Sequence, residues 1–487
     1  MWKPRPIIGT WTPDQKRAAE NFPAARRLCV VSANGVGKTY LAADLAVSFM
    51  LDHKAAIVLT TAPTQRQVEQ LLYPEVFRRL KHLGLVDADE EPGAIHLGAI
   101  PAAVAPLGAG TAARLIDQFH AIAAVAGARL IVSDRALPAE QIVDRVRLPP
   151  VLVLETVAEV STAPVARVAG SDDACFLQFT SGSTSVPKGV VVTHRMLLAN
   201  LATMSTAIGW GPQGRAVGWL PIYHDMSLVG IYAMTVLHRA RACFFPTSRF
   251  GRDPGMWLTL LAEERAQFSA GPNFAFAMIN RLAERRPPTG IDLSTMRGFI
   301  CGSEPISAAA MRGFAAVTAP LGLPHPAIPA FGMAECTLMA TCCEPGMPLA
   351  TIQVARRELE QSGRAVPITD PADAIELVSC GRAAPGMAIA IDVDGDSVGD
   401  DRVGEVLLSG DSVLTRYWRN DGATAQAFVE RAGRRWFRTG DLGFTRDGQL
   451  FVCGRAKDLI IHNGVNYYPA DIEHAPVSYT HLRAHET

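Results

Sequence analysis

The sequence lacks the features that mark secreted, membrane-spanning or strongly charged proteins. Its 487 residues include nine cysteines without a C-x-x-C pair, and the adjacent Cys342 and Cys343 do not bridge easily within ordinary geometry. No segment reads as a signal peptide, so we expect reduced thiols and a cytoplasmic protein. A long uncharged stretch, Ala94 to Ala113, contains two prolines and three glycines and makes a poor membrane helix. We therefore expect no membrane span.

Charge is balanced overall but not along the chain. The 46 basic and 47 acidic residues give no general attraction to nucleic acid or membranes. Residues 1–84, however, contain twelve Lys and Arg against six Asp and Glu, whereas the rest contains 34 against 41. A chain of this length exceeds one ordinary core, so we expect two or more domains. The change of sign places a candidate junction at residues 85–91.

One stretch, Leu177 to Gly189, has the composition of an anion-binding loop. We expect strands at Ala174–Phe179 and Val190–Val192, on either side of a loop rich in glycine and hydroxyl side chains. Glycines let backbone amides turn inward, hydroxyls add donors, and a lysine adds positive charge. A solvated linker is the plainer interpretation, but the flanking strands and the Pro-Lys-Gly ending argue against it. The candidate phosphate-binding residues are Thr180, Ser181, Gly182, Ser183, Thr184 and Lys188.

This loop resembles the phosphate loop of the adenylate-forming enzymes, the acyl- and aminoacyl-AMP ligases. The resemblance extends over about residues 92–473, and a charged segment ending in Leu377–Arg382 is most similar to the fatty acyl-AMP ligases. It implies an α/β fold. A large domain of layered α/β subdomains with a small β-subdomain (92–454) would precede a hinge and the start of a truncated small C-terminal domain (455–474). Further matching motifs lie at residues 218–226, 302–305, 331–337, 436–443 and 454–461.

The resemblance also implies roles for individual residues. The catalytic candidates are His224, near the acyl carbonyl and α-phosphate, with Lys188 and Glu335. Glu335 would hold Mg²⁺, a hard cation that prefers oxygen ligands. Asp441 would hydrogen-bond the ribose hydroxyls, and Arg455 would contact ribose or phosphate. The adenine site would be formed by Gly302, Ser303, Glu304, Phe331 and Gly332, and Lys457 would be the residue about which the small domain turns.

Several of these patterns have a structural interpretation as well. A single histidine is usually structural, although His224 follows an apolar strand beside Pro, Tyr and Asp. Residues 270–276 resemble the acyl-pocket wall of fatty acyl ligases, but a plain core segment fits them almost equally well. The acidic turn at residues 392–400 lacks the final glutamate of a calcium loop, so we expect a solvated hairpin there. We place Tyr417 and Trp418 with the small β-subdomain.

The two ends of the chain fit a different description. A strand at Leu28–Val31, a loop containing Gly35, Gly37, Lys38 and Thr39, and a second strand at Ala55–Thr61 resemble the start of a phage terminase large subunit. There Lys38 would reach the terminal phosphates and Thr39 would hold Mg²⁺. No later strand ends in the acidic pair such an ATPase needs, so residues 1–84 read as a partial P-loop fragment. Residues 475–487 resemble a translated sequencing adapter and are expected to be a non-native tail.

The function that the resemblance implies is ATP-dependent activation of a fatty acid to acyl-AMP, with Mg²⁺. The acceptor would be an acyl carrier protein and less readily coenzyme A, and the truncated chain would be impaired. The alternatives are a fragment of a DNA-packaging terminase ATPase, which would bind nucleic acid only if it were intact, or an inactive chimera.

Overall fold

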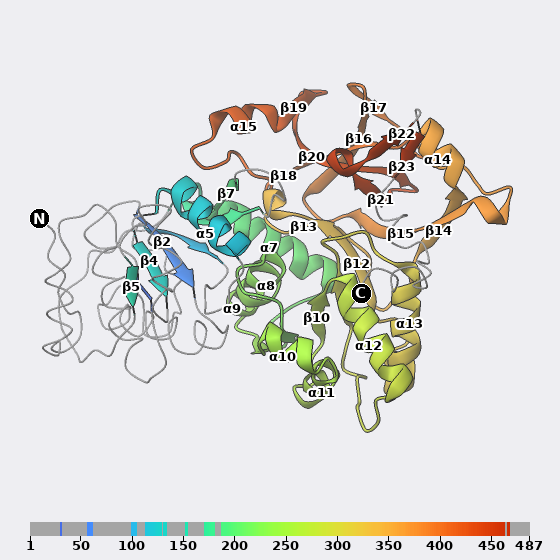
Figure 1. Ribbon diagram of the computed structural model, residues 1–487, viewed down its shortest axis with the longest axis horizontal. Coiled ribbons are helices and arrows are strands. Elements are labelled where there is room, and N and C mark those ends of the chain that lie inside the picture. The colour runs from blue at the N-terminus through green and yellow to red at the C-terminus, as the bar shows by residue number, and fades with distance from the viewer. Residues whose placement is uncertain are drawn as a thin grey trace, which may run out of the picture. The chain divides into compact units, whose positions relative to one another are not determined.

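The computed structural model describes residues 30–31, 56–61, 99–104, 113–128, 130–133, 151–153, 170–180, 187–462 and 465–467 (Figure 1). They belong to two compact units, each built from three stretches of the chain. The first unit takes residues 1–270, 333–338 and 411–426, and the second takes 271–332, 339–410 and 427–487.

A parallel sheet of five strands opens the first unit, in the order β1-β5-β4-β2-β3. The strands expected at residues 28–31 and 55–61 are confirmed by β1 and β2. Two of the five precede the predicted junction at residues 85–91 and three follow it, so one sheet draws on both sides of that junction. The bounds are β1 Val30–Val31, β2 Ala56–Thr61, β3 Ala99–Ala103, β4 Leu130–Ser133 and β5 Val151–Val153, and helix α5 is Ala113–Ala126.

The predicted phosphate loop connects an antiparallel pair of strands in the same unit. These are β6, Ala174–Phe179, and β7, Gly189–Thr193, and their apolar residues are almost all buried. Helix α7, His194–Ile208, begins directly after β7, where the Thr193 side chain accepts a hydrogen bond from the amide of Met196. It ends at Gly209, whose φ of 67° is a conformation that glycine adopts at little cost.

The rest of the first unit surrounds an aromatic cluster. Trp219 stacks on Phe250 with ring centroids 3.8 Å apart, and Trp257 meets both rings edge-on. All three side chains are buried. The remaining elements are β8 Arg215–Gly218, α8 Asp225–Ser227, the π-helical η3 Leu228–Ala233, α9 Met234–His238, β9 Arg241–Phe244, α10 Thr247–Arg252, α11 Gly255–Glu263, β10 Phe268–Gly271, η5 Ala334–Cys336 and α15 Asp421–Gln426.

In the second unit the strands follow the order β17-β16-β18-β20-β21-β15-β13-β12-β11. The β11–β12 pair is parallel and the others are antiparallel. The strands are β11 Gly298–Cys301, β12 Ala327–Gly332, β13 Met339–Cys342, β14 Thr351–Ala355, β15 Ala374–Ala383, β16 Met387–Val393, β17 Asp396–Val398, β18 Gly404–Gly410, β19 Phe428–Arg431, β20 Arg434–Arg446, β21 Gln449–Arg455, β22 Ile460–His462 and β23 Val465–Tyr467. The helices are α12 Asn273–Arg285, α13 Ala308–Thr318, η4 Ala319–Leu321, α14 Arg356–Ser362, η6 Pro371–Asp373 and η7 Ala456–Asp458.

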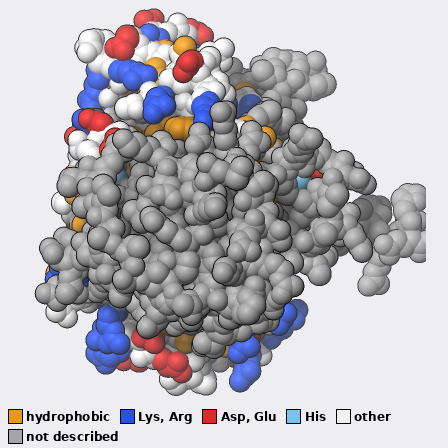
Figure 2. All heavy atoms as spheres, turned by 90° about the vertical axis from the view of Figure 1, so that its left-hand side faces the viewer, with side chains coloured by type: hydrophobic (Ala, Val, Ile, Leu, Met, Phe, Trp, Pro, Cys, Tyr) orange, Lys and Arg blue, Asp and Glu red, His pale blue; other side chains and the backbone are white. Residues whose placement is uncertain are grey.

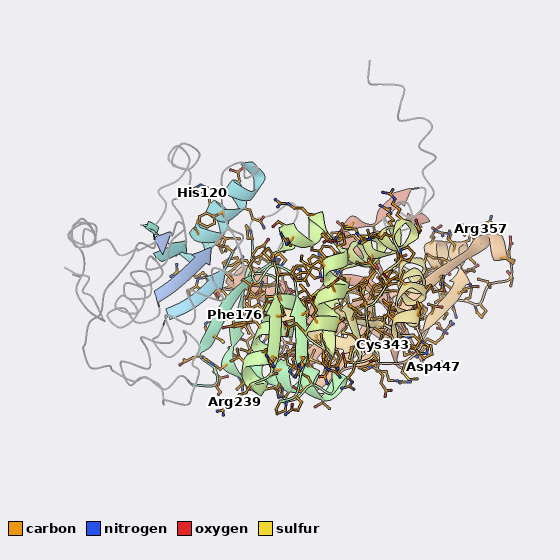
Figure 3. All side chains as sticks on the ribbon, turned by 90° about the horizontal axis from the view of Figure 1, so that it is seen from below. His120, Phe176, Arg239, Cys343, Arg357 and Asp447 are labelled. Carbon is orange, nitrogen blue, oxygen red and sulfur yellow. The ribbon has the colours of Figure 1, made fainter. Side chains whose placement is uncertain are left out.

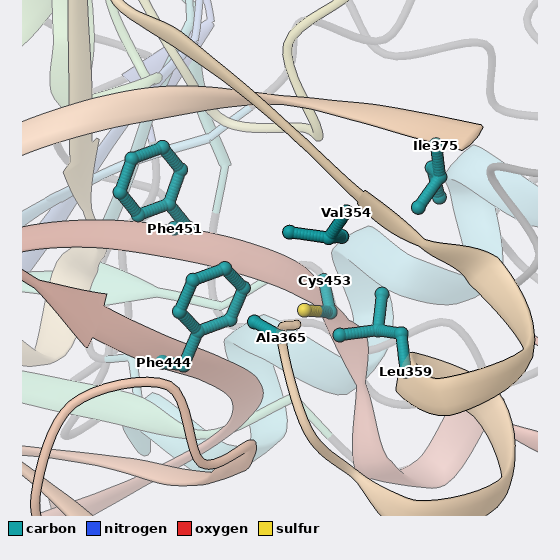
Figure 4. Packing of buried hydrophobic residues seen from close by; sticks show 7 residues of the cluster. All are labelled: Val354, Leu359, Ala365, Ile375, Phe444, Phe451 and Cys453. Atoms are coloured by element: carbon teal, nitrogen blue, oxygen red, sulfur yellow. The ribbon is translucent and has the colours of Figure 1, made fainter. Parts of the chain in front are cut away.

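A compact apolar cluster lies where β14, β15, β20 and β21 meet α14 (Figure 4). Phe444 stacks on Phe451 with centroids 5.2 Å apart and planes 10° from parallel. The cluster is completed by Val354, Leu359, Ala365, Ile375 and Cys453. Alternate residues of the long hairpin β20–β21 thus supply this core, and the hairpin closes at the exposed turn of Asp447 and Gly448, both at positive φ (Figure 3).

The solvated hairpin expected at residues 392–400 is confirmed. The acidic segment around residues 392–400 forms the β16–β17 hairpin, whose Asp394 and Gly395 turn is exposed. The eight cysteines that the structure describes are all free. None of the described helices is long and apolar enough to cross a membrane. Where described side chains reach the face in Figure 2, acidic and basic groups are interspersed, as the balanced charge predicts.

Candidate functional site

The base of the predicted phosphate loop is closed by a backbone hydrogen bond. The amide of Thr180, at the end of β6, donates to the carbonyl of Lys188 at 3.1 Å, just before β7. Gly189 faces the ring of Phe179, and a Cβ at that glycine would lie 3.2 Å from the ring. Thr180 and Lys188 therefore lie side by side at the two ends of the predicted loop. The candidates Ser181, Gly182, Ser183 and Thr184 lie outside the described residues.

Residues 416–418 run antiparallel to β7. Tyr417 pairs with Val190. The amide of Trp418 donates to the carbonyl of Gly189 at 2.7 Å, and the amide of Val191 donates to the carbonyl of Arg416 at 3.4 Å. Our placement of Tyr417 and Trp418 in the small β-subdomain is therefore wrong. The edge of β7 that faces away from β6 offers unpaired backbone groups, and this segment satisfies them.

Tyr417 contacts two of the predicted catalytic residues. Its hydroxyl donates to Glu335 Oε1 at 2.9 Å, and Lys188 Nζ lies 5.2 Å from the centre of its ring. Burial, with the nearby charge of Glu335 and this hydrogen bond, raises the pKa of Tyr417 far above its ordinary value. The phenol therefore stays protonated and acts as the donor. The structure thus brings Lys188 and Glu335 together through a residue that we did not select from the sequence.

The turn that carries Glu335 is fixed by a buried polar network. Asn200 of α7 donates through Nδ2 to the carbonyl of Cys336 at 3.2 Å and to Ser412 Oγ at 3.1 Å. Thr337, at a φ of 73°, donates through its hydroxyl to the carbonyl of Ser412 at 2.9 Å. The carbonyl of Glu335 itself accepts from the amide of Leu414 at 2.7 Å. These bonds hold a conformation that is costly for a β-branched residue.

His224 occupies the start of a helical segment. It was expected at the tip of a strand, but β8 ends at Gly218 and a turn closed by the His224 amide and the Pro221 carbonyl leads into α8. Its Nδ1 lies 2.9 Å from Asp225 Oδ1. Burial lowers the pKa of His224, but the hydrogen bond and charge of Asp225 outweigh it and raise the pKa overall. The side chain is 42% exposed, so it remains reachable from solvent.

The strand that enters the phosphate loop also supports the histidine segment. Gln178 of β6 donates through Nε2 to the carbonyl of Tyr223 at 2.9 Å. Gln178 is buried within an otherwise apolar strand. This polar residue was the one signal in the sequence that the strand makes a side-chain contact beyond its own hairpin.

In the second unit, Asp441 and Arg455 are neighbours across β20 and β21. Arg455 Nε donates to Asp441 Oδ1 at 3.0 Å, and Asp441 is almost fully buried. The preceding residue, Gly440, has a φ of 72°, and its amide donates a hydrogen bond to Glu405 Oε1 at 3.1 Å. This bond fixes the backbone just before Asp441. Lys457 follows in η7 and is exposed. Two predicted nucleotide-binding residues therefore meet in this hairpin.

The predicted adenine-site residues lie at the ends of two parallel strands. Gly302, Ser303 and Glu304 follow β11, and Phe331 and Gly332 end β12. Ser303 is held at a φ of 73°, and a Cβ at Gly302 would lie 2.8 Å from the carbonyl of Ala330.

Asn273, at the start of α12, holds this loop from the side. Its Nδ2 donates to the carbonyl of Pro305, and its Oδ1 accepts from the amide of Ser307 at 3.1 Å. Asn273 belongs to the segment predicted as an acyl-pocket wall. The neighbouring Phe274 is 52% exposed, unlike a core residue, whereas Phe276 is fully buried.

The second nucleotide-binding motif falls outside the described residues. That motif comprises Gly35, Gly37, Lys38 and Thr39. The predicted tail at 475–487 also lies outside the described residues. Within the described ranges, no group of three or more His, Cys, Asp or Glu side chains is placed to hold a metal ion.

Comparison with known proteins assigns the chain to a family. A family model described as AMP-binding enzyme matches residues 93–418, more than half of the chain. The long-chain-fatty-acid–AMP ligase FadD26 of Mycobacterium bovis is 40% identical over 317 residues, which cover 62% of this chain and 54% of that relative. A 4-hydroxyphenylalkanoate adenylyltransferase of Mycobacterium tuberculosis is 34% identical over 313 residues, which cover 61% and 50%. The chain thus spans about half the length of these curated relatives.

Solved structures agree with this assignment. A structure from a study of fatty acyl-adenylate ligases from E. coli and L. pneumophila aligns with a TM-score of 0.72 and 28% identity, covering 90% of this chain and 76% of that one. A fatty acyl-adenylate ligase from L. pneumophila in complex with acyl adenylate and pyrophosphate, at 24% identity and a TM-score of 0.72, shares the fold. Nothing in these comparisons supports a terminase-like segment.

Proposed function

The chain belongs to the AMP-binding enzyme family, and on that premise we propose that it activates a fatty acid with ATP, giving acyl-AMP and pyrophosphate. The observation that carries the proposal is the convergence of Lys188 and Glu335 on Tyr417. An ammonium group and a carboxylate at the mouth of a phosphate loop are the charges that a metal–triphosphate substrate requires. The similarity to long-chain-fatty-acid–AMP ligases supports a fatty acid as the acid.

The carboxylate of Glu335 fits a magnesium ion. It is half-buried, its direction is fixed by the Tyr417 hydroxyl, and among the described residues it belongs to no group of three or more metal-ligating side chains. Magnesium is usually held by one or two carboxylates together with substrate phosphates and waters, so a cluster of three protein ligands is not required. When bound, the ion would neutralise charge on the phosphate oxygens.

The remaining residues divide the work between binding and charge stabilisation. Lys188 and the Thr180 end of the loop bind phosphate oxygens, and His224 donates a hydrogen bond to charge that develops at the reacting carboxylate or α-phosphate. Asp441 accepts hydrogen bonds from the ribose hydroxyls, with Arg455 holding its carboxylate in place. The adenine lies against Phe331 and the loop at residues 302–304. Attack of the substrate carboxylate on the α-phosphorus forms the acyl–phosphate bond and expels pyrophosphate.

We further propose that the acyl group passes to the thiol of a carrier protein in preference to coenzyme A. This rests on the similarity to fatty acyl-AMP ligases, most visible in the segment ending at residues 377–382. A second function as a DNA-packaging ATPase is not favoured, because no comparison supports it.

Two measurements on this chain test the proposal. The first is calorimetric titration with AMP and with a non-hydrolysable dodecanoyl-adenylate analogue, which should bind more tightly because it fills both subsites. The second is exchange of labelled pyrophosphate into ATP in the presence of dodecanoate, with Lys188→Met as the matched inactive variant. Failure to bind either nucleotide would remove the basis for the proposal. Exchange supported equally by an acid without an alkyl chain would overturn the fatty acid as substrate.

A further inference from the structure

We propose that Tyr417 is a positioning residue for the metal–triphosphate end of the site, its hydroxyl directing Glu335 and its ring directing Lys188. This inference rests on the proposed function and adds a residue to it. Tyr417 is not placed to react, because its contacts are with side chains that would touch the nucleotide. Its role is to hold two opposite charges in separate, fixed directions.

The backbone of Tyr417 is fixed on three sides. It pairs with Val190 of β7, its amide donates to Thr424 Oγ1 at 3.0 Å, and the next residue donates to the carbonyl of Gly189 at 2.7 Å. The side chain itself is buried to 4% exposure. The bridge to β7 thus holds the tyrosine beside the exit of the phosphate loop.

The other end of the tyrosine meets a turn that is equally constrained. Glu335 accepts the hydroxyl at 2.9 Å through Oε1, while its carbonyl accepts from Leu414, three residues before Tyr417. Asn200 and Thr337 hold the same turn through Ser412. Residues 412–417 therefore form one rigid connection between the Glu335 turn and the exit of the phosphate loop, and Tyr417 is the member whose side chain contacts both charges.

The two contacts differ in what they do. The hydroxyl engages one carboxylate oxygen through a charge-assisted hydrogen bond, which sets the plane of the carboxylate toward a cation. The ring gives the Lys188 ammonium a preferred position without neutralising it, because the ring carries no net charge. A carboxylate in the ring's place would neutralise the lysine that the phosphates need. The lysine side chain is long and flexible, so a contact that gives its ammonium group a preferred position has a large effect on it.

The contacts can be separated by substitution. Tyr417→Phe removes the hydroxyl and keeps the ring, whereas Tyr417→Leu removes both. Tyr232→Phe, in η3 of the same unit, is the matched control for loss of a tyrosine hydroxyl elsewhere. We would measure calorimetric binding of ATP with and without Mg²⁺, binding of AMP without divalent ions, and Mn²⁺ binding in the presence of ATP by electron paramagnetic resonance.

We expect Tyr417→Phe to weaken Mg²⁺-dependent ATP binding and Mn²⁺ binding roughly tenfold, as for loss of a hydrogen bond to a charged group. Binding of AMP should stay within about twofold of wild type, because Tyr417 contacts Glu335 and Lys188 and none of the residues assigned to the nucleoside. Tyr417→Leu should add a loss, several-fold in size, that appears even without metal. In a Glu335→Gln background, Tyr417→Phe should have little further effect on Mn²⁺ binding, since the two residues act through one bond.

The results that would overturn the inference are distinct from those that would overturn the function. Tyr417→Phe could bind ATP with the same dependence on Mg²⁺ as the wild-type chain, or its loss of Mn²⁺ binding could add to that of Glu335→Gln in the double variant. Either result would show that Tyr417 does not position the carboxylate. Parallel losses of AMP and ATP binding would assign it a merely structural role. If the wild-type chain binds neither AMP nor ATP, the proposed function and this inference both fall.

Discussion

Arg455 faces Asp441 across the β20–β21 ladder, and its Nε donates to Asp441 Oδ1 at 3.0 Å. The aspartate side chain is 6% exposed and the arginine 52% exposed, so the pair joins a buried acid to a solvated base. Burial of a charge is tolerated when it is paired and hydrogen-bonded, and the amide of Asp441 is itself satisfied by Thr439 Oγ1 at 3.0 Å. The carboxylate is therefore held in one direction before any nucleotide arrives.

Substitution Asp441→Ala should weaken AMP binding by about 1.5–3 kcal/mol, the range for hydrogen bonds to a charged group. This corresponds to roughly ten- to 150-fold in the calorimetric dissociation constant. Folding should be little affected, since the arginine left behind is exposed. Asp396→Ala, on the exposed strand β17, is the control and should bind AMP normally. Equal AMP affinity in Asp441→Ala and wild type would remove Asp441 from the ribose site.

The pKa of His224 should lie above its ordinary value of 6.5. It should fall in Asp225→Asn, because the charge of Asp225 that raises the pKa is lost while burial still lowers it. NMR titration of the imidazole resonances measures both values, and the other histidine resonances should not change. A raised folded-state pKa means that the charged pair stabilises the fold fully below pH 6.5 and loses this effect as the pH rises through the raised value. Asp225→Asn should therefore lower the free energy of unfolding more at pH 6 than at pH 8. An unchanged titration would show that Asp225 does not control the histidine.

Removal of the Asn273 amide should loosen the loop at residues 302–307. Asn273→Ala loses both hydrogen bonds, and we expect AMP affinity to fall by about 1 kcal/mol, whereas Asn273→Asp keeps the acceptor for Ser307 and should lose less. Asn280→Ala is the matched control, since it loses a bond of 2.9 Å to the carbonyl of Ala310 on α13, the helix that follows the loop. Calorimetric titration with AMP measures the affinity of each variant and so compares the Asn273 and Asn280 substitutions. An equal effect from Asn280→Ala would mean that the helix pair, and not the loop, is responsible.

Substitution Phe444→Ala should lower the free energy of unfolding by about 3–5 kcal/mol, because it opens a cavity against Phe451 inside the cluster of Figure 4. Phe428→Ala, in which the ring is only half-buried on β19, should cost about 1 kcal/mol. Urea denaturation monitored by circular dichroism gives both values. Comparable losses for the two phenylalanines would contradict the assignment of this cluster as a core of the second unit.

Local elements were well predicted by the sequence. The bounds of β6 agree with the predicted range to the residue, since it is a continuous apolar run with polar neighbours. The candidate site residues Lys188, Glu335, Asp441 and Arg455 were selected by motif, because each lies in a short, recognisable pattern, and their roles stay predictions. The pairing of Asp441 with Arg455 follows from a hairpin, whose two strands are adjacent in the sequence.

Contacts between distant segments were not predictable in this way. Tyr417 pairs with Val190, which lies more than two hundred residues earlier in the chain. The hydrophobic periodicity of residues 411–420 does not predict that partner. Asn200 did carry a signal. It is buried on α7 beside Leu201 and Met204, and a polar residue on an apolar helix face requires a partner. Its partners, Cys336 and Ser412, come from segments that only the fold brings together.

The parallel sheet of the first unit bears on the timing of folding during synthesis. Its strand β1 pairs, among the described strands, with β4 and β5, and Val30 lies opposite Leu152. At about 5–20 residues per second, a ribosome needs roughly 6–24 s between β1 and β5. Closing a loop of that length is entropically costly, and parallel pairings of this kind form slowly. Strand β1 therefore cannot complete its pairing in the sheet until β5 has been synthesised.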